Sequence, residues 1–136
     1  MSDIENKNLY FDGYMTMKKW LENRNQGKTF AEYFKECGYK TVAIYEITDM
    51  GKLLYDEIKD SDIEVAYFVD RNAEGLREVD GIPVIMLQDV SKMQKSRPAD
   101  ILVVSPVVDY NKITKALAHF APELPTMYIK DVVYEF

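Results

Sequence analysis

From residue 40 onward, short runs of β-branched and other apolar residues alternate with segments whose apolar residues recur at helical spacing. A short apolar run without polar alternation is typical of a strand that is buried on both faces, and strands that alternate with helices form parallel sheets. This alternation predicts an α/β fold with five strands. The strands are expected at residues 41–45, 64–69, 82–86, 100–104 and 125–129.

Right-handed crossovers between parallel strands leave few topologies for such a chain. The usual order across the sheet is 3-2-1-4-5, with the strands numbered along the chain. We therefore expect a three-layer, Rossmann-like fold with helices on both faces of a parallel sheet. In that fold, ligands bind at the carboxyl ends of the strands where the strand order reverses. Here that position lies between the loops at residues 46–51 and 105–109.

Two helices are predicted before the sheet. Residues 1–38 are therefore expected to form an N-terminal helical arm, and residues 39–136 the Rossmann-like domain. In the first helix, Met17, Trp20 and Leu21 form one apolar stripe. Because two helices are too few to form a domain alone, we expect them to pack on the sheet or on a second subunit.

The second helix is expected to begin at Thr29, because residues 29–32 have the form of a capping box, and to end near Gly38. Its apolar face is expected to contain Phe30, Tyr33, Phe34 and Cys37. This prediction makes the single cysteine of the chain a core thiol rather than a reactive one.

The charge balance and the apolar pattern exclude several classes of partner. A net charge of −6 argues against nucleic acid or an anionic membrane surface, since both attract a basic face. The sequence contains no apolar run of membrane-spanning length and no signal peptide, so we expect no membrane insertion and a cytoplasmic location. No cluster of cysteine and histidine predicts a metal site.

The loop after the first strand lies where a dinucleotide-binding loop would carry the pattern G-x-G-x-x-G. The three glycine positions fall on Glu46, Thr48 and Gly51. In the pattern, the first glycine makes a tight turn, the second admits the pyrophosphate and the third lets the helix pack closely on the strand. Only the packing glycine, Gly51, is therefore retained.

The residues that replace the glycines disfavour a phosphate. At a separation of roughly 5 Å, the carboxylates of Glu46 and Asp49 would each repel a phosphate by about 1–3 kcal/mol. The helix N-terminus attracts it by only about 0.3–1 kcal/mol. Thr48 or Asp49 can instead cap the following helix. We therefore disfavour NAD(P) as a cofactor, and the cofactor is unknown.

Two further residues are candidates for ligand contacts at the same edge. Asp70 ends the second strand, 24 residues after Glu46, close to where the ribose-binding acid of a dinucleotide fold stands. A turn residue is the alternative interpretation of Asp70. Ser105 follows the fourth strand and could bond a ligand from the opposite wall. The candidate binding residues are Glu46, Thr48, Asp49, Gly51, Asp70 and Ser105.

Four stretches carry a resemblance to a known type of domain: residues 41–45, 51–54, 67–72 and 80–85, the last reading Asp-Gly-Ile-Pro-Val-Ile. With them, the segment from Tyr39 to Ile129 resembles a Rossmann-like nucleotide-binding module of bacterial surface-polysaccharide biosynthesis. It is similar to the N-terminal domains of CapD-type sugar-nucleotide epimerase/dehydratases and of PglD-type sugar acyltransferases, and to short modules attached to glycosyltransferases.

The resemblance implies a nucleotide or nucleotide-sugar as ligand. It carries the family's acid onto Asp70 and its third glycine onto Gly51, while the chain departs from the family's loop at Glu46 and Thr48. The catalytic parts of those relatives, a left-handed β-helix or a second domain, have no counterpart in this sequence. Their catalysis is therefore not carried over.

Three hypotheses follow for the function. The first is a Rossmann-like module that is non-catalytic or binds a nucleotide or nucleotide-sugar weakly. The second is an active sugar-nucleotide enzyme that uses Glu46 or Asp49 as an acid/base group. The third is a protein-interaction or oligomerisation module, whose N-terminal helices with Trp20 and Phe34 contact another copy or a glycosyltransferase partner. No set of catalytic residues can be assigned from spacing.

Overall fold

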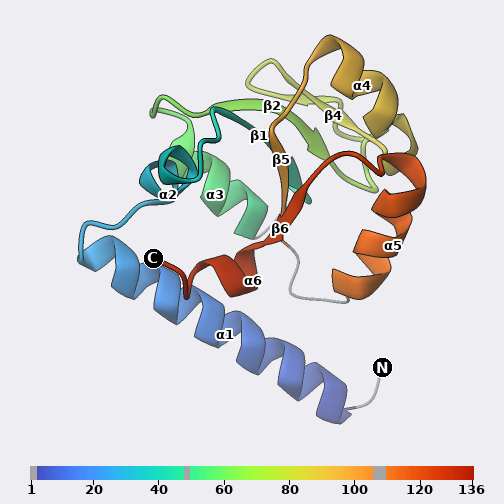
Figure 1. Ribbon diagram of the computed structural model, residues 1–136. Coiled ribbons are helices and arrows are strands. Elements are labelled where there is room, and N and C mark those ends of the chain that lie inside the picture. The colour runs from blue at the N-terminus through green and yellow to red at the C-terminus, as the bar shows by residue number, and fades with distance from the viewer. Residues whose placement is uncertain (1–2, 48–49, 106–109) are drawn as a thin grey trace.

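The computed structural model describes residues 3–47, 50–105 and 110–136, which form helices around one mixed sheet (Figure 1). The elements are α1 Asp3–Asn25, α2 Phe30–Glu36, β1 Thr41–Tyr45, α3 Met50–Ile58, β2 Glu64–Val69, β3 Glu78–Val79, β4 Ile82–Ile85, the 3-10 helix η1 Leu87–Asp89, α4 Val90–Ser96, β5 Ile101–Val104, α5 Tyr110–Phe120, β6 Thr126–Tyr128 and α6 Ile129–Val132. All five predicted strands are present, with ends shifted by at most about one residue.

The sheet has six strands in the order β3-β4-β2-β1-β5-β6. The pairs β4–β2, β2–β1, β1–β5 and β5–β6 are parallel, and β3 pairs with β4 in the antiparallel direction. The five predicted strands thus keep the relative order 3-2-1-4-5, but the prediction of five strands is corrected by the additional edge strand β3. The carboxyl end of the central strand β1 lies beside the carboxyl ends of β2 and β5, because Tyr45 pairs with Val69 and Val104.

The additional strand β3 belongs to a tight hairpin. Asp80 and Gly81 connect Val79 to Ile82, with positive φ angles of 52° and 82°. Two consecutive residues with positive φ form a type I′ turn, whose twist matches that of the two strands. Asp-Gly is a preferred pair for this turn, so the sequence contained the signal for a hairpin here.

The two faces of the sheet carry separate hydrophobic clusters. On β1, Val42 and Ile44 belong to one cluster, with residues of α1, α2, α3 and α6, whereas Ala43 and Tyr45 belong to the other, with residues of α4 and α5. Because successive strand residues point to opposite faces, the clusters lie on opposite sides of the sheet. Figure 1 shows α4 and α5 on one side of the strands and the other helices across from them.

A buried carboxylate on α3 holds the N-terminal helices. Glu57 accepts hydrogen bonds from the Trp20 indole and from the backbone N–H of Phe30, both at 2.9 Å, and it pairs with Arg24 Nε at 3.2 Å. Its side chain is only 4% exposed. A buried charge is tolerated when it is paired and hydrogen-bonded, so Glu57 can join α1, α2 and α3 at one point.

The face of α1 that meets the body is formed by Thr16, Trp20 and Asn23, at i, i+4 and i+7, all of which are buried. The predicted stripe of Met17, Trp20 and Leu21 is therefore corrected. Trp20 is buried and Met17 is partly buried, but Leu21 is 60% exposed. The helix is rotated so that two polar side chains, Thr16 and Asn23, are buried where apolar periodicity predicts Leu21. Thr16 Oγ1 and Asn23 Nδ2 each donate a hydrogen bond, whereas the buried Asn23 Oδ1 has no partner among the described residues.

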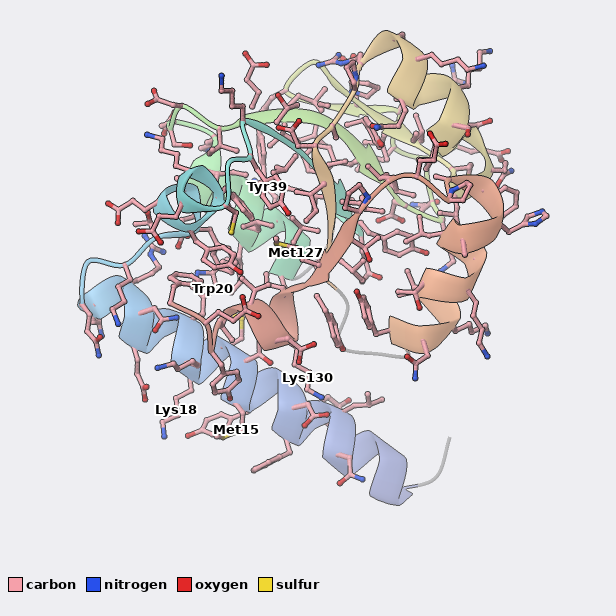
Figure 2. All side chains as sticks on the ribbon, viewed as in Figure 1. Met15, Lys18, Trp20, Tyr39, Met127 and Lys130 are labelled. Carbon is pink, nitrogen blue, oxygen red and sulfur yellow. The ribbon has the colours of Figure 1, made fainter. Side chains whose placement is uncertain are left out.

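Two long-range contacts join α1 to the C-terminal segment. Asn23 Nδ2 donates to the Val133 carbonyl at 2.7 Å, and Lys130 on α6 pairs with Asp12 at 2.8 Å. Figure 2 shows Lys130 reaching toward α1 and Trp20 directed into the body, with Lys18 on the outer side of the helix. The N-terminal helices thus pack on the body, which is one of the two arrangements expected from the sequence.

The predicted cap of the second helix is confirmed, because Thr29 Oγ1 accepts a hydrogen bond from the Glu32 N–H at 3.3 Å. Phe30 and Phe34 are fully buried, as expected. The prediction that Cys37 is a core thiol is wrong, because α2 ends at Glu36 and Cys37 is exposed at the C-cap.

Candidate functional site

The loop after β1 lies at the carboxyl edge of the sheet, where the sequence predicts a ligand site. Glu46 has a positive φ of 71°, and its backbone N–H donates to the Val69 carbonyl at 2.7 Å. A left-handed backbone costs an L-residue about 1–2 kcal/mol, whereas glycine adopts it readily. The loop therefore keeps the tight turn that the first glycine makes in a dinucleotide-binding loop, although a glutamate occupies the position.

Gly51, in the first turn of α3, packs directly on this loop. A Cβ atom added at Gly51 would lie 1.7 Å from the Glu46 carbonyl oxygen and 3.0 Å from Ser105 Oγ. No side chain fits at such a distance from the backbone. Gly51 therefore has the packing role expected of the third glycine position.

Ser105 takes part in the hydrogen bonding of the loop itself. The side chain is buried, and its hydroxyl donates to the carbonyl oxygens of Tyr45, at 2.5 Å, and Glu46, at 3.0 Å. A hydroxyl has one proton, and here that proton is shared between the carbonyl oxygens of the last residue of β1 and the first residue after it. The structure thus places Ser105 as a link between the ends of β1 and β5, instead of on a ligand-facing wall.

Asp70 lies at the predicted edge and joins two loops. Its Oδ2 accepts a hydrogen bond from the Ile47 N–H at 3.0 Å, and its Oδ1 accepts one from the Asn72 N–H at 2.9 Å. The second bond is an Asx turn, as expected for an aspartate in a turn. Each oxygen keeps a further lone-pair site, so the carboxylate can accept a ligand hydroxyl in addition.

A shallow pocket of about 330 Å³ opens at this edge, at the lower end of the range for small-molecule sites. It is lined by Tyr45, Glu46, Asp70, Arg71 and Asn72. Burial raises the pKa of the Tyr45 phenol, so that group is neutral at physiological pH. Of the predicted site residues, the pocket contains Glu46 and Asp70. Tyr45, Arg71 and Asn72 were not predicted as site residues, although Arg71 and Asn72 directly follow Asp70.

Thr48 and Asp49, which were predicted as site residues, lie outside the described residues. Within the described ranges, no group of three or more His, Cys, Asp or Glu side chains is placed to hold a metal ion. No helix in the part of the chain that the structure describes is long and apolar enough to cross a membrane.

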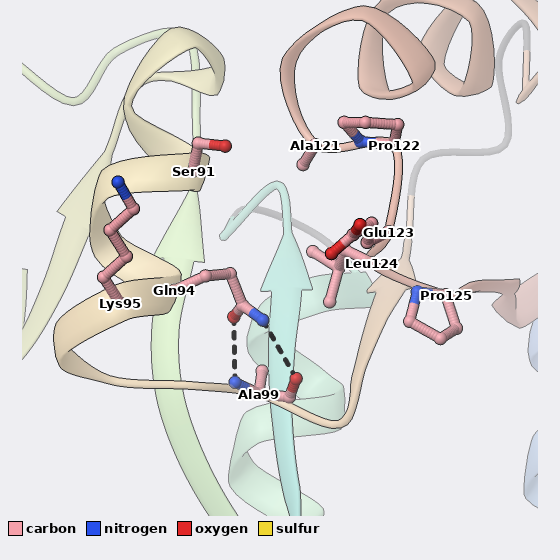
Figure 3. Close-up of a pocket in the computed structure, with 9 residues that line it drawn as sticks. All are labelled: Ser91, Gln94, Lys95, Ala99, Ala121, Pro122, Glu123, Leu124 and Pro125. Carbon is pink, nitrogen blue, oxygen red and sulfur yellow. Dashed lines mark hydrogen bonds between the residues drawn. The ribbon is translucent and has the colours of Figure 1, made fainter.

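A second pocket, of about 440 Å³, lies at the opposite edge, before the start of β5 and β6 (Figure 3). Its main polar group is Gln94, whose Oε1 accepts from the Ala99 N–H and the Tyr67 hydroxyl and whose Nε2 donates to the Ala99 carbonyl. Alanine, proline and leucine form much of the remaining wall. The Gln94 amide is used within the protein, and Ser91, Lys95 and Glu123 add polar groups at the wall. This pocket lies away from the carboxyl ends of the strands, where ligands bind in this type of fold.

Comparison with known proteins does not identify a relative. No family model, no curated protein and no solved structure matches this chain. The chemistry of a ligand is therefore inferred from the residues that line the pocket.

Proposed function

We propose that this chain is a non-catalytic, Rossmann-like module that binds the sugar hydroxyls of a nucleotide or nucleotide-sugar weakly, in surface-polysaccharide biosynthesis. The observation that carries the proposal is the pocket beside Asp70 and Glu46, at the sheet edge where related folds hold a ribose. Carboxylates accept hydrogen bonds from hydroxyl groups, and Asn72 and Arg71 add donors to the same pocket.

Weak binding is expected because the phosphate-binding part of the loop is altered. Glu46 places a carboxylate where a pyrophosphate would lie, and it repels a phosphate by about 1–3 kcal/mol. Contacts to the sugar remain, so we expect a dissociation constant on the order of 1 mM, or about −4 kcal/mol. Asp70 is fixed by two backbone N–H groups, which suits a positioned hydrogen-bond acceptor better than a group that transfers protons.

The test is a calorimetric titration with uridine, a UDP-sugar, NAD and NADP. We expect uridine and the UDP-sugar to bind near 1 mM, and the dinucleotides to bind no more tightly. In Glu46→Gln, affinity for the UDP-sugar should increase by about fivefold or more while affinity for uridine is unchanged, because only the UDP-sugar carries phosphate. The matched control is Glu78→Gln, on the exposed strand β3.

Two results would contradict the proposal. One is a submillimolar affinity of the unmodified chain for NAD or NADP. The other is the absence of saturable binding by every compound of the panel. An equal response of uridine and the UDP-sugar to Glu46→Gln would place the phosphates away from the loop and overturn the assigned pose.

A further inference from the structure

The outer side of α1 carries an uninterrupted apolar stripe. Tyr10, Tyr14, Met17 and Leu21 follow one another at spacings of four, three and four residues. This spacing is that of the contact seam in a helical coiled coil. Tyr10 is 80% exposed and Tyr14 is 63% exposed, as expected for side chains on the side of the helix away from the body.

The stripe is separate from the face that holds α1 in place. That inner face uses Thr16, Trp20 and Asn23, which are buried and hydrogen-bonded to the protein. The helix therefore presents contact residues on two sides. The inner side is covered, whereas Tyr10, Tyr14 and Leu21 of the stripe are exposed and Met17, at its border, is partly buried against the core. A partner can therefore bind to the outer side without breaking the contacts of Trp20 and Arg24 with Glu57.

A groove between α1 and α3 extends the stripe. It has a volume of about 220 Å³, and its walls include Met17, Leu21 and Arg24 of α1 and Leu53 of α3. Leu53 is 45% exposed, whereas Leu54 and Ile58 of the same helix lie in the core. The apolar surface thus continues from one helix onto a second.

The exposed aromatic side chains of this surface supply about half the area that a dimer interface needs from one partner. Tyr10 and Tyr14 of the stripe, and Phe11 next to it, are 61–80% exposed. A fully exposed aromatic side chain has an area of about 200 Å², so the exposed fractions of these three side chains together present about 400 Å². That is half of the roughly 800 Å² that one partner contributes to a standard interface. Leu21, Leu53 and the polar residues beside them extend the patch toward the full value.

We propose that this stripe pairs with the same stripe of a second copy of the chain, with the two α1 helices antiparallel about a two-fold axis. An axis between Tyr14 and Met17 sets Tyr10 against Leu21 and Tyr14 against Met17, so that every stripe residue meets a stripe residue. The ring of Tyr10 then lies over the groove of the other copy, where the Arg24 guanidinium can stack on it.

The composition argues against a membrane as the partner of the stripe. The chain has a net charge of −6, which is repelled by an anionic surface, whereas a membrane-bound amphipathic helix is usually rich in lysine and arginine. The stripe itself contains no charged residue, so a two-fold axis does not bring like charges together at its centre. This inference is independent of the ligand proposed above, because the stripe and the pocket have no residue in common.

The first test is the mass of the full chain in solution, measured by light scattering or sedimentation. At about 100 µM, above the micromolar dissociation constants of the weaker interfaces of this size, we expect twice the chain mass of 15.8 kDa. Leu21→Glu and Tyr14→Glu should each weaken the dimer by about tenfold or more. Leu76→Glu is the matched control, since it changes an exposed leucine in the loop before β3 and should leave the dimer intact.

The second test is the register, measured by disulfide formation in a Cys37→Ser background. When Tyr10→Cys and Leu21→Cys chains are mixed in equal amounts and oxidised, the disulfide between the two variants should exceed the sum of the two symmetric disulfides, which is the amount that random pairing would give. An excess of a symmetric disulfide would overturn the antiparallel pairing. A monomeric native chain, or a dimer that persists in both glutamate variants while their circular dichroism stays native, would overturn the interface itself.

Discussion

The loop after β1 places polar and charged groups in a half-buried position, whereas the outer face of α1 places aromatic groups in solvent. Next to this loop, Ser105 after β5 and Asp70 after β2 bind backbone groups of the protein itself. On the helix, Tyr10 and Tyr14 extend into solvent. Residue type alone therefore does not identify a binding surface. A polar group that is already hydrogen-bonded within the protein is less available to a partner than a side chain exposed to solvent.

The strongest test of this comparison is one substitution made in both regions. Gly51→Ala should cost about 3 kcal/mol or more of unfolding free energy, because its Cβ would lie 1.7 Å from the Glu46 carbonyl, which is backbone and cannot rotate away. Gly13→Ala, in α1, meets no atom within 4 Å and should stabilise the protein by up to about 1 kcal/mol. Urea denaturation measures both, and effects of the same sign would refute the tight packing of the loop.

A second substitution tests whether the hydrogen bonds on the inner side of α1 stabilise the protein, as those around the loop are expected to do. Glu57→Ala should cost about 2–3 kcal/mol, because it leaves the Trp20 indole and the Phe30 N–H without their acceptor. Amide exchange should accelerate along α1 and α2. Asp56→Ala, at the exposed neighbouring position, should change stability by less than about 1 kcal/mol. Equal losses in the two variants would show that Glu57 does not anchor the helices.

A third test uses the pH dependence of stability at the edge of the sheet where the strands begin. There Asp100, like Asp70, accepts hydrogen bonds from backbone N–H groups. Asp100 Oδ2 accepts hydrogen bonds from the N–H groups of Lys40, at 2.8 Å, and Thr41, at 3.0 Å. These bonds, that from Lys40 first, hold the pKa of the Asp100 carboxyl below its usual range. Its stabilisation is therefore present above the unfolded pKa and is lost as the pH falls through the folded one.

Asp100→Asn should accordingly cost about 1 kcal/mol at neutral pH, a modest value because the residue is exposed. The difference from the native chain should narrow as the pH falls below about 4. Urea unfolding across that range measures it. A difference that stays constant down to the acid limit would contradict a role for the ionised carboxylate.

The smallest expected effect concerns the backbone of Glu46. Glu46 adopts a left-handed backbone conformation that costs an L-residue about 1–2 kcal/mol, and Glu46→Gly removes that cost. The glycine also stabilises the unfolded state by about 0.5–1 kcal/mol through its greater chain entropy. We expect a net gain of about 0.5 kcal/mol, seen as a higher melting temperature. Glu74→Gly, at an exposed turn position without positive φ, should lower it. A loss in both variants would mean that the glutamate side chain contributes more than the backbone strain.

The sheet could be predicted because its signals are local. Each strand is a short apolar run, and the handedness of crossovers then determines how the parallel strands are ordered. The packing role of Gly51 also follows from its position in the loop pattern. The edge strand β3 was missed although Asp80-Gly81 marks its turn, because the two-residue strand is too short to show alternation.

The hydrogen bonds that polar side chains form with distant parts of the chain could not be predicted. Glu57 bonds residues that lie 27 and 37 positions away, and Ser105 bonds residues 59 and 60 positions away. No local pattern encodes such partners. The rotation of α1 was missed for the same reason, since buried Asn23 depends on a carbonyl near the other end of the chain.

The hydrogen bond from Asn23 to Val133 also sets an order of events during synthesis. It joins residues 110 positions apart. A ribosome adds about 5–20 residues per second, so α1 emerges on the order of ten seconds before the segment that it docks against has been made. During that interval Asn23 lacks its acceptor, although Trp20 and Arg24 can already contact Glu57. The docking of α1 is thus completed only after the segment that follows α6 has been made, whereas the contacts to Glu57 can form earlier.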